Sequence, residues 1–340
     1  MPRTRLRRPP GALALLFAVA VGAAGSFGVL TSAEEQSAQV QRVEGLDDVL
    51  AANDGPAENY LLVGSDSREN VDPNDPNAAV YGSPDDVVGR RSDTIMVLRR
   101  EKSGGASMVS LPRDLWVEIA GTDESAKINS AYNGGPDRLA ATVTQALDIP
   151  IHHYVEIDFV GFTRMVDEVG GVDICFDYPT RDANSGLDVQ PGCQRLNGVQ
   201  SLAYARSRYF EEFIDGDWVM DGRADIGRIE RQQIFIRAAV TQLLAELEGN
   251  PFGMNDLIGA AADAVRIDEG ADPVAAAIAL RAAASTGLQT YALPVVGVER
   301  QGQSALELDD GADAILDYFR GIGPQPVTEP PPSVPTATTD

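Results

Sequence analysis

The sequence is poor in histidine, and this shortage excludes two common kinds of catalytic site. His152 and His153 are the only two histidines among 340 residues. Because they are adjacent, they do not supply the separated ligands of a histidine-rich zinc site, nor do they suggest the base of a Ser-His-Asp triad. We therefore predict that both histidines are ordinary surface or structural residues.

Basic residues are also scarce relative to acidic ones. The chain has 27 Lys and Arg against 51 Asp and Glu, which gives a formal net charge of -24. A nucleic-acid-binding protein needs a basic face to neutralise phosphates, so we predict no nucleic acid partner. We interpret the acidic surface as a contribution to solubility. A cluster of arginines would stand out against this background.

Charge is absent from one long segment near the N-terminus. Residues 11–30 carry no charged side chain, and four arginines lie among the first eight residues. A helix of about 20 residues spans the hydrocarbon core, and its positive flank stays in the cytoplasm. We predict a cytoplasmic segment 1–10 and a signal-anchor 11–30, which make a single-pass cell-membrane protein with its bulk outside. A signal peptide cleaved near Ala33 is the alternative, and it also exports the chain.

Only two cysteines are present, Cys175 and Cys193. In an oxidising exterior an even, closely spaced pair is typical of a disulfide. Closing so short a loop stabilises a fold by about 3 kcal/mol in the chain-entropy model. Two cysteines do not make a metal cluster, so we predict a structural disulfide.

Short apolar segments alternate with segments of helical periodicity. We expect buried strands at 59–64, 94–98, 106–111, 172–176 and 288–296, and helices at 136–147, 159–169, 225–247 and 271–284. The second and third strands, joined by a glycine-containing turn, predict a hairpin. The alternation predicts an α/β (α+β) fold, with a central mixed β-sheet covered by helices.

Composition also predicts where the single domain begins and ends. Residues 31–57 are small, polar and acidic, which is typical of an extracytoplasmic linker. We place the folded catalytic domain at 58–320, with a long loop at 69–88. Residues 321–340 are rich in proline and threonine and predict a disordered tail.

Arginine, aspartate and glycine gather at the ends of the predicted elements. In an extended segment Arg206 and Arg208 point to one face, and Arg228 and Gln232 share one face of a helix. Guanidinium groups match the oxygens of a phosphate, so these residues favour a pyrophosphate ligand. The alternative for each arginine is a structural salt bridge with a nearby carboxylate.

Two aspartates near these arginines have a separate role open to them. Asp66 and Asp93 follow and precede predicted strands, and two carboxylates facing a pyrophosphate can share Mg²⁺. The alternative for both is loop capping.

These segments form an ordered series of motifs. They are Gly64-Ser65-Asp66, Arg91-Ser92-Asp93-Thr94, Leu111-Pro112-Arg113-Asp114, Lys127-Ile128-Asn129 with Ala131-Tyr132, Gly170-Gly171-Val172, Leu196-Asn197-Gly198, Ala203-Tyr204 with Arg206 and Arg208, and Gly227-Arg228 with Arg231-Gln232. The series, over about residues 58–248, resembles the LytR-CpsA-Psr family.

The resemblance implies an extracytoplasmic phosphotransferase that moves a glycopolymer from polyprenyl pyrophosphate to peptidoglycan. The glycopolymer is of the teichoic acid, capsule or arabinogalactan type, and polyprenyl phosphate leaves. The resemblance also implies an apolar tunnel between sheet and helices for the lipid, and Mg²⁺, or Mn²⁺ in its place, as cofactor.

The resemblance assigns roles to individual residues. The catalytic residues it implies are Asp66, Arg91, Asp93 and Arg113, of which Asp66 and Asp93 hold the metal. The pyrophosphate-binding residues it implies are Arg68, Arg91, Arg113, Lys127, Arg206, Arg208, Arg228, Arg231 and Gln232. With no histidine in any motif, the carboxylate of Asp93 is also the candidate base for the acceptor hydroxyl.

Two other functions are compatible with the same motifs. The first is a pyrophosphatase, in which water replaces the acceptor hydroxyl. The second is a non-catalytic protein that binds lipid-linked precursors. The acidic segment 209–223, between the last two arginine motifs, is a candidate lid or acceptor contact.

Overall fold

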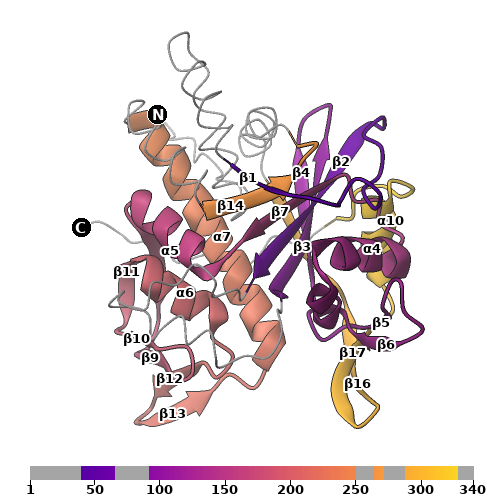
Figure 1. The fold of residues 1–340 in the computed structure, drawn as a ribbon. Coiled ribbons are helices and arrows are strands. Elements are labelled where there is room, and N and C mark those ends of the chain that lie inside the picture. The colour runs from indigo at the N-terminus through magenta and orange to yellow at the C-terminus, as the bar shows by residue number, and fades with distance from the viewer. Residues whose placement is uncertain (1–39, 66–91, 250–263, 272–287, 328–340) are drawn as a thin grey trace.

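The computed structural model describes residues 40–65, 92–249, 264–271 and 288–327 (Figure 1). Within these ranges the largest sheet has seven strands in the order β1-β14-β7-β2-β3-β4-β15. Its strands are β1 (Gln41–Val43), β2 (Ala57–Ser65), β3 (Ser92–Glu101), β4 (Ala106–Leu111), β7 (His153–Ile157), β14 (Val265–Asp268) and β15 (Leu288–Ala292). The β1/β14, β2/β7 and β4/β15 pairs are parallel and the other three are antiparallel. The predicted mixed sheet is confirmed.

Helices cover both faces of this sheet. They are η2 (Ile128–Gly134), α4 (Pro136–Leu147), α5 (Phe159–Glu168), α6 (Gly198–Arg206), α7 (Ala224–Gly249) and α10 (Ala312–Arg320). Figure 1 shows α5, α6 and α7 on one side of the sheet, with α4 and α10 on the other.

Strand β2 shows how the sheet forms two cores. Side chains alternate along a strand, so Leu62 packs with α5 and α7 while Leu61 and Val63 pack with α4 and α10. A strand buried on both faces reads as a continuous apolar run, which is why its sequence predicted a buried strand. The Ala57–Ser65 strand therefore lies at the centre of the molecule.

Local signals set the helix ends. α4 begins with Pro136 in its first turn, and the carboxylate of Asp158 caps α5 by accepting a hydrogen bond from Gly161 N at 2.7 Å. Asn197 and Gln200 form a capping box at the start of α6. The helices predicted at 136–147 and 225–247 and the hairpin of β3 and β4 are confirmed.

Four smaller strands form a second sheet beside α6. They are β9 (Thr180–Asp182), β10 (Leu187–Val189), β12 (Glu211–Ile214) and β13 (Asp217–Met220), in the order β10-β9-β12-β13. The two-stranded pairs are β5 (Trp116–Glu118) with β6 (Ser125–Lys127), β8 (Val172–Phe176) with β11 (Gly192–Leu196), and β16 (Val295–Arg300) with β17 (Gln303–Leu308). The predicted disulfide is confirmed: Cys175 and Cys193 are directly opposite in the β8/β11 register and are bonded.

The domain boundaries differ from those predicted. β1 belongs to the central sheet, and Val43 and Leu46 are buried, so the folded part includes residues that were assigned to a linker. At the other end, Gln325 donates to Ser107 Oγ at 3.1 Å and Pro326 accepts from Tyr291, so the first part of the predicted tail packs on the domain. The N-terminal segment is held by β1 pairing and by the burial of Val43 and Leu46 in the core, whereas the C-terminal segment is held by polar contacts.

Several predicted segments lie outside the described residues. They are the signal-anchor at 11–30, the loop at 69–88, nearly all of the helix at 271–284 and the end of the tail. Among the helices that are described, none combines the length and apolar character needed to cross a bilayer.

Candidate functional site

An apolar pocket lies between the central sheet and helices α5, α6 and α7. It holds about 890 Å³, counting its open mouth. Its apolar lining comes from Leu62, Val63, Met96, Met108, Val155, Ile157, Phe159, Phe162, Met165, Leu202, Ala205 and Val265. The family resemblance implied a lipid tunnel between sheet and helices, and this pocket lies between those layers. Whether it continues as a tunnel stays a prediction.

Three of the predicted pyrophosphate-binding residues line this same pocket. Arg206 ends α6, and its guanidinium carbon lies 4.5 Å from the centre of the Phe159 ring. Arg228 and Gln232 lie one turn apart on α7 and are 3% and 6% exposed. Residues far apart in the sequence thus bring two arginines to a largely apolar cavity, whose lining also includes Thr94 and Asp158.

Gln232 joins three elements around the pocket. Its side-chain amide donates to Thr94 Oγ1 at 2.9 Å and to the Ala205 carbonyl at 3.1 Å. These bonds tie α7 to β3 and to α6. Since both amide hydrogens are engaged, Gln232 positions the pocket walls, and donating to a phosphate would require it to give up one of these bonds.

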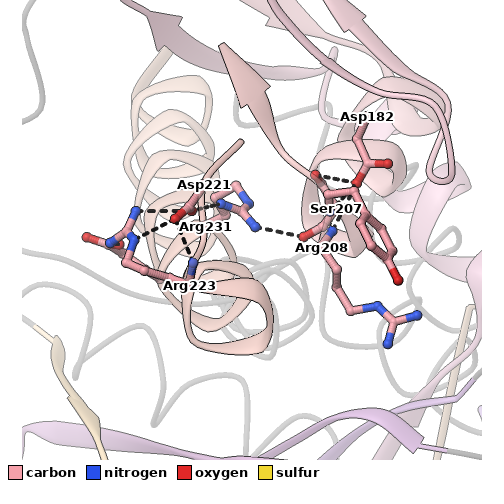
Figure 2. A network of polar contacts seen from close by, with 8 residues as sticks. Asp182, Ser207, Arg208, Asp221, Arg223 and Arg231 are labelled. Carbon is pink, nitrogen blue, oxygen red and sulfur yellow. Dashed lines mark hydrogen bonds and ion pairs between the residues drawn. The ribbon is translucent and has the colours of Figure 1, made fainter. Parts of the chain in front are cut away.

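Arg231 points into a different environment from Arg228. It donates to the Asp221 carboxylate at 2.9 Å and to the Ser207 carbonyl at 2.8 Å (Figure 2). Its guanidinium carbon also lies 4.5 Å from the centre of the Phe210 ring. Burial raises the pKa of Asp221, but hydrogen bonds from Arg223 and Arg231 outweigh this and lower it to about 2. For Arg231 the structure therefore shows the salt-bridge alternative.

The segment after Arg206 is held by a carboxylate that sequence reasoning missed. Asp182 Oδ2 accepts from Ser207 Oγ at 2.7 Å, from Arg208 N at 3.0 Å and from Tyr209 N at 2.9 Å (Figure 2). Burial raises the pKa of Asp182, yet these bonds lower it overall. Asp182 lies in β9, and no local pattern links it to the arginine motif.

Arg206 and Arg208 have different surroundings. Arg206 is the last residue of α6 and lines the pocket, and Ser207 is the C-cap. The side chain of Arg208 is exposed, and Figure 2 shows it extending away from the Asp182 carboxylate. That both arginines bind one pyrophosphate stays a prediction.

Arg113 and Lys127 meet at Asp114, outside the set of pocket-lining residues. Lys127 Nζ lies 3.0 Å from one Asp114 oxygen, and Arg113 Nε lies 3.8 Å from the other. The backbone joins them as well, because Asn129 N donates to the Arg113 carbonyl at 3.2 Å. The two predicted cations thus form one cluster around a carboxylate.

Strand register places the backbone of Asp93, one of the two predicted metal ligands. Asp66 lies outside the described residues, as do Arg68 and Arg91. Gly64 pairs with Thr94 and Ser65 pairs with Ser92, which leaves Asp93 as the extra residue of a β-bulge. Bulges re-aim side chains and are frequent beside active sites.

The Mg²⁺ site stays a prediction. Ser65, the residue before Asp66 in the sequence, pairs with Ser92, the residue before Asp93. Carboxylate oxygens suit Mg²⁺, which takes one or two of them together with phosphate oxygens. In the part of the chain that the structure describes, no cluster of three or more acidic, histidine or cysteine side chains is arranged to hold a metal.

Comparison with known sequences identifies relatives across most of the chain. The LytR_cpsA_psr family model matches residues 26–315. The probable cell wall biosynthesis protein LcpB of Corynebacterium glutamicum is 33% identical over 320 residues, which are 92% of this chain and 72% of that protein. The polyisoprenyl-teichoic acid–peptidoglycan teichoic acid transferase TagV of Bacillus subtilis is 37% identical over 163 residues, 46% of this chain and 39% of that protein.

Solved structures share the fold. A LytR-Csp2A-Psr enzyme from Actinomyces oris superposes with a TM-score of 0.62 at 24% identity, covering 82% of this chain and 95% of that one. A structure described as TagT bound to LI-WTA gives a TM-score of 0.58 at 20% identity, covering 83% and 98%. At these identities the comparison establishes the architecture of the sheet and its covering helices.

Proposed function

The chain belongs to the LytR-CpsA-Psr family, and on that premise we propose that it transfers a glycopolymer from a polyprenyl-pyrophosphate carrier to peptidoglycan. The names of its relatives support this reaction, since TagV is called a polyisoprenyl-teichoic acid–peptidoglycan teichoic acid transferase. The observation that carries the proposal is the pocket, whose largely apolar lining also includes Arg206 and Arg228.

The pocket suits a lipid with a charged end. Burying apolar chain contributes about 0.8 kcal/mol per CH₂ group, so a polyprenyl chain gains from entering the apolar part. Two guanidinium groups on the same pocket favour a multivalent anion, because each unit-charge pair at about 4 Å interacts by about 4 kcal/mol at an effective dielectric near 20. A polyprenyl pyrophosphate suits both parts of this lining, because its lipid chain matches the apolar residues and its pyrophosphate matches the two arginines.

The reaction follows from this binding mode. An acceptor hydroxyl attacks the phosphorus that bears the sugar, the bond to the lipid phosphate breaks, and polyprenyl phosphate leaves. Arg206 and Arg228 stabilise the negative charge that moves to the departing lipid phosphate. Asp93 is the carboxylate proposed to accept the hydroxyl proton.

A metal ion fits the same site. Asp66 and Asp93 are the residues that would hold Mg²⁺, or Mn²⁺ in its place. When bound, the ion supplies positive charge next to the phosphate oxygens, which lowers the cost of charge build-up. A carboxylate that binds the ion is a weaker base, so Asp93 serves one of these roles more strongly than the other.

Two observations support a location of the catalytic domain outside the cytoplasm. The disulfide between Cys175 and Cys193 is favoured outside the cytoplasm, and the uncharged segment 11–30 is the predicted membrane anchor. We therefore place the catalytic domain outside the cell membrane, next to peptidoglycan.

A transfer assay tests the function. Synthetic polyprenyl-pyrophosphoryl sugar and a peptidoglycan oligomer are incubated with the full chain, with Mg²⁺ or with EDTA, for wild type, Asp93→Ala and Arg206→Ala. We expect a sugar phosphate linked to the oligomer, lost with EDTA and reduced in both variants. Free sugar phosphate without linked product would identify a pyrophosphatase, and unchanged lipid bound tightly would identify a binding protein.

A further inference from the structure

The outer face of the β10-β9-β12-β13 sheet gathers exposed apolar side chains. In the antiparallel register Phe213 lies opposite Trp218, and Glu211 lies opposite Met220. Because side chains alternate along a strand, these four share one face, and the pairing of Glu211 with Arg181 adds Arg181 to it. Phe213, Trp218 and Met220 remain 39%, 36% and 52% exposed. We call Arg181, Glu211, Phe213, Trp218 and Met220 the platform.

The opposite face of the same sheet packs on the domain at β9 and β10, whereas at β13 that face is also open to solvent, with Val219 49% exposed. Thr180, Asp182, Leu187 and Val189 alternate with the platform positions and are all buried. An antiparallel sheet with one buried face normally presents polar residues on the other. Two aromatic rings and a methionine on the solvent side therefore depart from the usual pattern, and exposed apolar groups of this kind mark binding sites.

The aromatic rings of the platform are held in place. Phe213 and Trp218 have ring centres 5.3 Å apart, and the Arg181 guanidinium carbon lies 3.9 Å from the centre of the Trp218 ring. Arg181 also donates to Glu211 at 2.7 Å, which fixes it over the ring. A fixed ring loses little conformational entropy when a ligand stacks on it.

The platform is joined to the pyrophosphate site through the buried face of its sheet. Asp182 in β9 holds the backbone of Arg208 and Tyr209, directly after the pocket residue Arg206. Arg231 on α7 bridges Ser207, on the same loop, to Asp221, which follows β13. Both ends of the β12–β13 hairpin are thus attached to the elements that carry the pocket arginines.

We propose that the platform binds the glycan strand of the peptidoglycan acceptor, an inference that rests on the proposed function. The faces of pyranose rings are apolar and stack on aromatic rings, while Arg181 and Glu211 can hydrogen-bond sugar hydroxyls. A strand bound here runs beside the loop of Arg206 without competing with the lipid for the pocket.

Charge favours a glycan strand over an anionic lipid surface, a phosphate-rich polymer or a second copy of the chain as the ligand of the platform. The hairpin carries the exposed acidic residues Asp215 and Asp217 at its turn. These carboxylates repel an anionic lipid surface and a phosphate-rich polymer, and a second copy of a chain with net charge -24 is disfavoured too. The pyranose faces of a peptidoglycan glycan strand are uncharged, because its carboxylates lie on the lactyl and peptide substituents, so its rings can stack on the platform at a smaller electrostatic cost.

The first test measures binding of a lipid-free peptidoglycan glycan oligomer by titration calorimetry. We expect Trp218→Ala to weaken binding about tenfold, which corresponds to the loss of one aromatic contact. Trp218→Tyr should retain most of the affinity. Val296→Ala, which truncates an exposed apolar residue on the distant β16, should bind as wild type does. Equal oligomer affinity in wild type and Trp218→Ala would overturn the proposal.

The second test separates the acceptor from the donor. In the transfer assay Trp218→Ala should raise the KM for the oligomer about tenfold and leave the affinity for polyprenyl pyrophosphate unchanged. A weakened affinity for the lipid with unchanged oligomer binding would assign the platform to the donor and overturn the proposal. Binding to anionic vesicles or self-association lost in Trp218→Ala, with unchanged oligomer binding, would overturn it as well. The calorimetric test uses no lipid, so its failure is distinct from a failure of the transfer reaction.

Discussion

At the residue scale, the two ends of one short motif have different surroundings. Arg206 lies on the ring of Phe159 and lines the pocket, whereas Arg208 is exposed. The motif showed that arginines gather here, but not that α6 ends between them. The sequence could therefore predict the kind of residue at the site, and the helix end decided which one enters the cavity.

The planar guanidinium of Arg206 is expected to be necessary, beyond its charge. Lysine in its place keeps the charge but loses both the stacking on Phe159 and the forked donors that match phosphate oxygens. We expect Arg206→Lys to weaken binding of polyprenyl pyrophosphate at least about tenfold in equilibrium titration. The matched control is Arg195→Lys. Arg195 lies on β11 and forms an exposed ion pair with Asp173 on β8. Equal affinity in the two variants would contradict the role assigned to Arg206.

Glu58 makes stability depend on pH. This buried carboxylate accepts from Asn53 at 2.6 Å, from Tyr60 at 3.0 Å and from Arg100 Nε at 2.9 Å. Burial raises its pKa, but the hydrogen bonds prevail and lower it from 4.5 to about 2. Because the folded pKa is below the unfolded value, the stabilisation is present above pH 4.5 and is lost as the pH falls toward 2.

The pH dependence gives a direct measurement. Denaturant titrations at about pH 5 and about pH 3 should show a smaller loss of unfolding free energy in Glu58→Gln than in wild type. The variant should also be less stable than wild type at pH 7, because it removes a charge-assisted partner of Arg100. Glu118→Gln, at an exposed position in β5, serves as control. Parallel losses in wild type and Glu58→Gln would refute the assignment.

At the element scale, helix α6 depends on a close approach to α5. A Cβ added at Gly198, in the first turn of α6, would overlap the carbonyl oxygen of Thr163. Backbone atoms cannot yield as the end of a flexible side chain can, so we expect Gly198→Ala to lower the unfolding free energy by about 1 to 3 kcal/mol. Gly297→Ala meets no atom within 4 Å and is the control in thermal and denaturant unfolding. A variant at Gly198 as stable as that at Gly297 would show that the two helices can separate.

The disulfide connects β8 and β11 at the edge of the α5–α7 layer. Its two cysteines are separated by 18 positions in the chain, and loop closure of this size contributes about 3 kcal/mol in the chain-entropy model. We expect the double variant Cys175→Ser, Cys193→Ser to unfold at lower denaturant concentration by about that free energy. Wild type treated with reductant should unfold as the variant does. A midpoint unaffected by either change would mean that the strand pairing alone supplies the constraint.

At the scale of the whole molecule, local signals predicted elements better than they predicted their assembly. The start of α4 at Pro136, the start of α5 at Phe159 and the β3–β4 hairpin follow from neighbouring residues, and all three elements were predicted. The β1/β14 pair joins segments more than 200 residues apart, Gln41 with Arg266, so no local pattern revealed it. The Asp182 network is missed for the same reason, since a carboxylate in β9 stabilises a loop that follows α6.

In the candidate site too, local motifs predicted which residues take part, while the fold decides which of them meet. The motifs predicted Arg206, Arg228 and Gln232, and the fold brings these three to one pocket. The motifs alone could not separate them from Arg231, because residues one position apart on a helix point in different directions and only packing decides which faces the cavity. The roles of Asp66, Arg68 and Arg91 stay predictions from the motifs.

The proposed function requires that one cavity holds the polyprenyl chain and its pyrophosphate together. The most direct measurement is the affinity of the full chain for polyprenyl pyrophosphate, compared between wild type and Met96→Trp, which would place an indole in the apolar part of the pocket. We expect the variant to remain folded and to bind the lipid at least about tenfold more weakly, while binding inorganic pyrophosphate as wild type does. Undiminished lipid binding in the folded variant would contradict this proposal, because the polyprenyl chain would then lie outside the pocket.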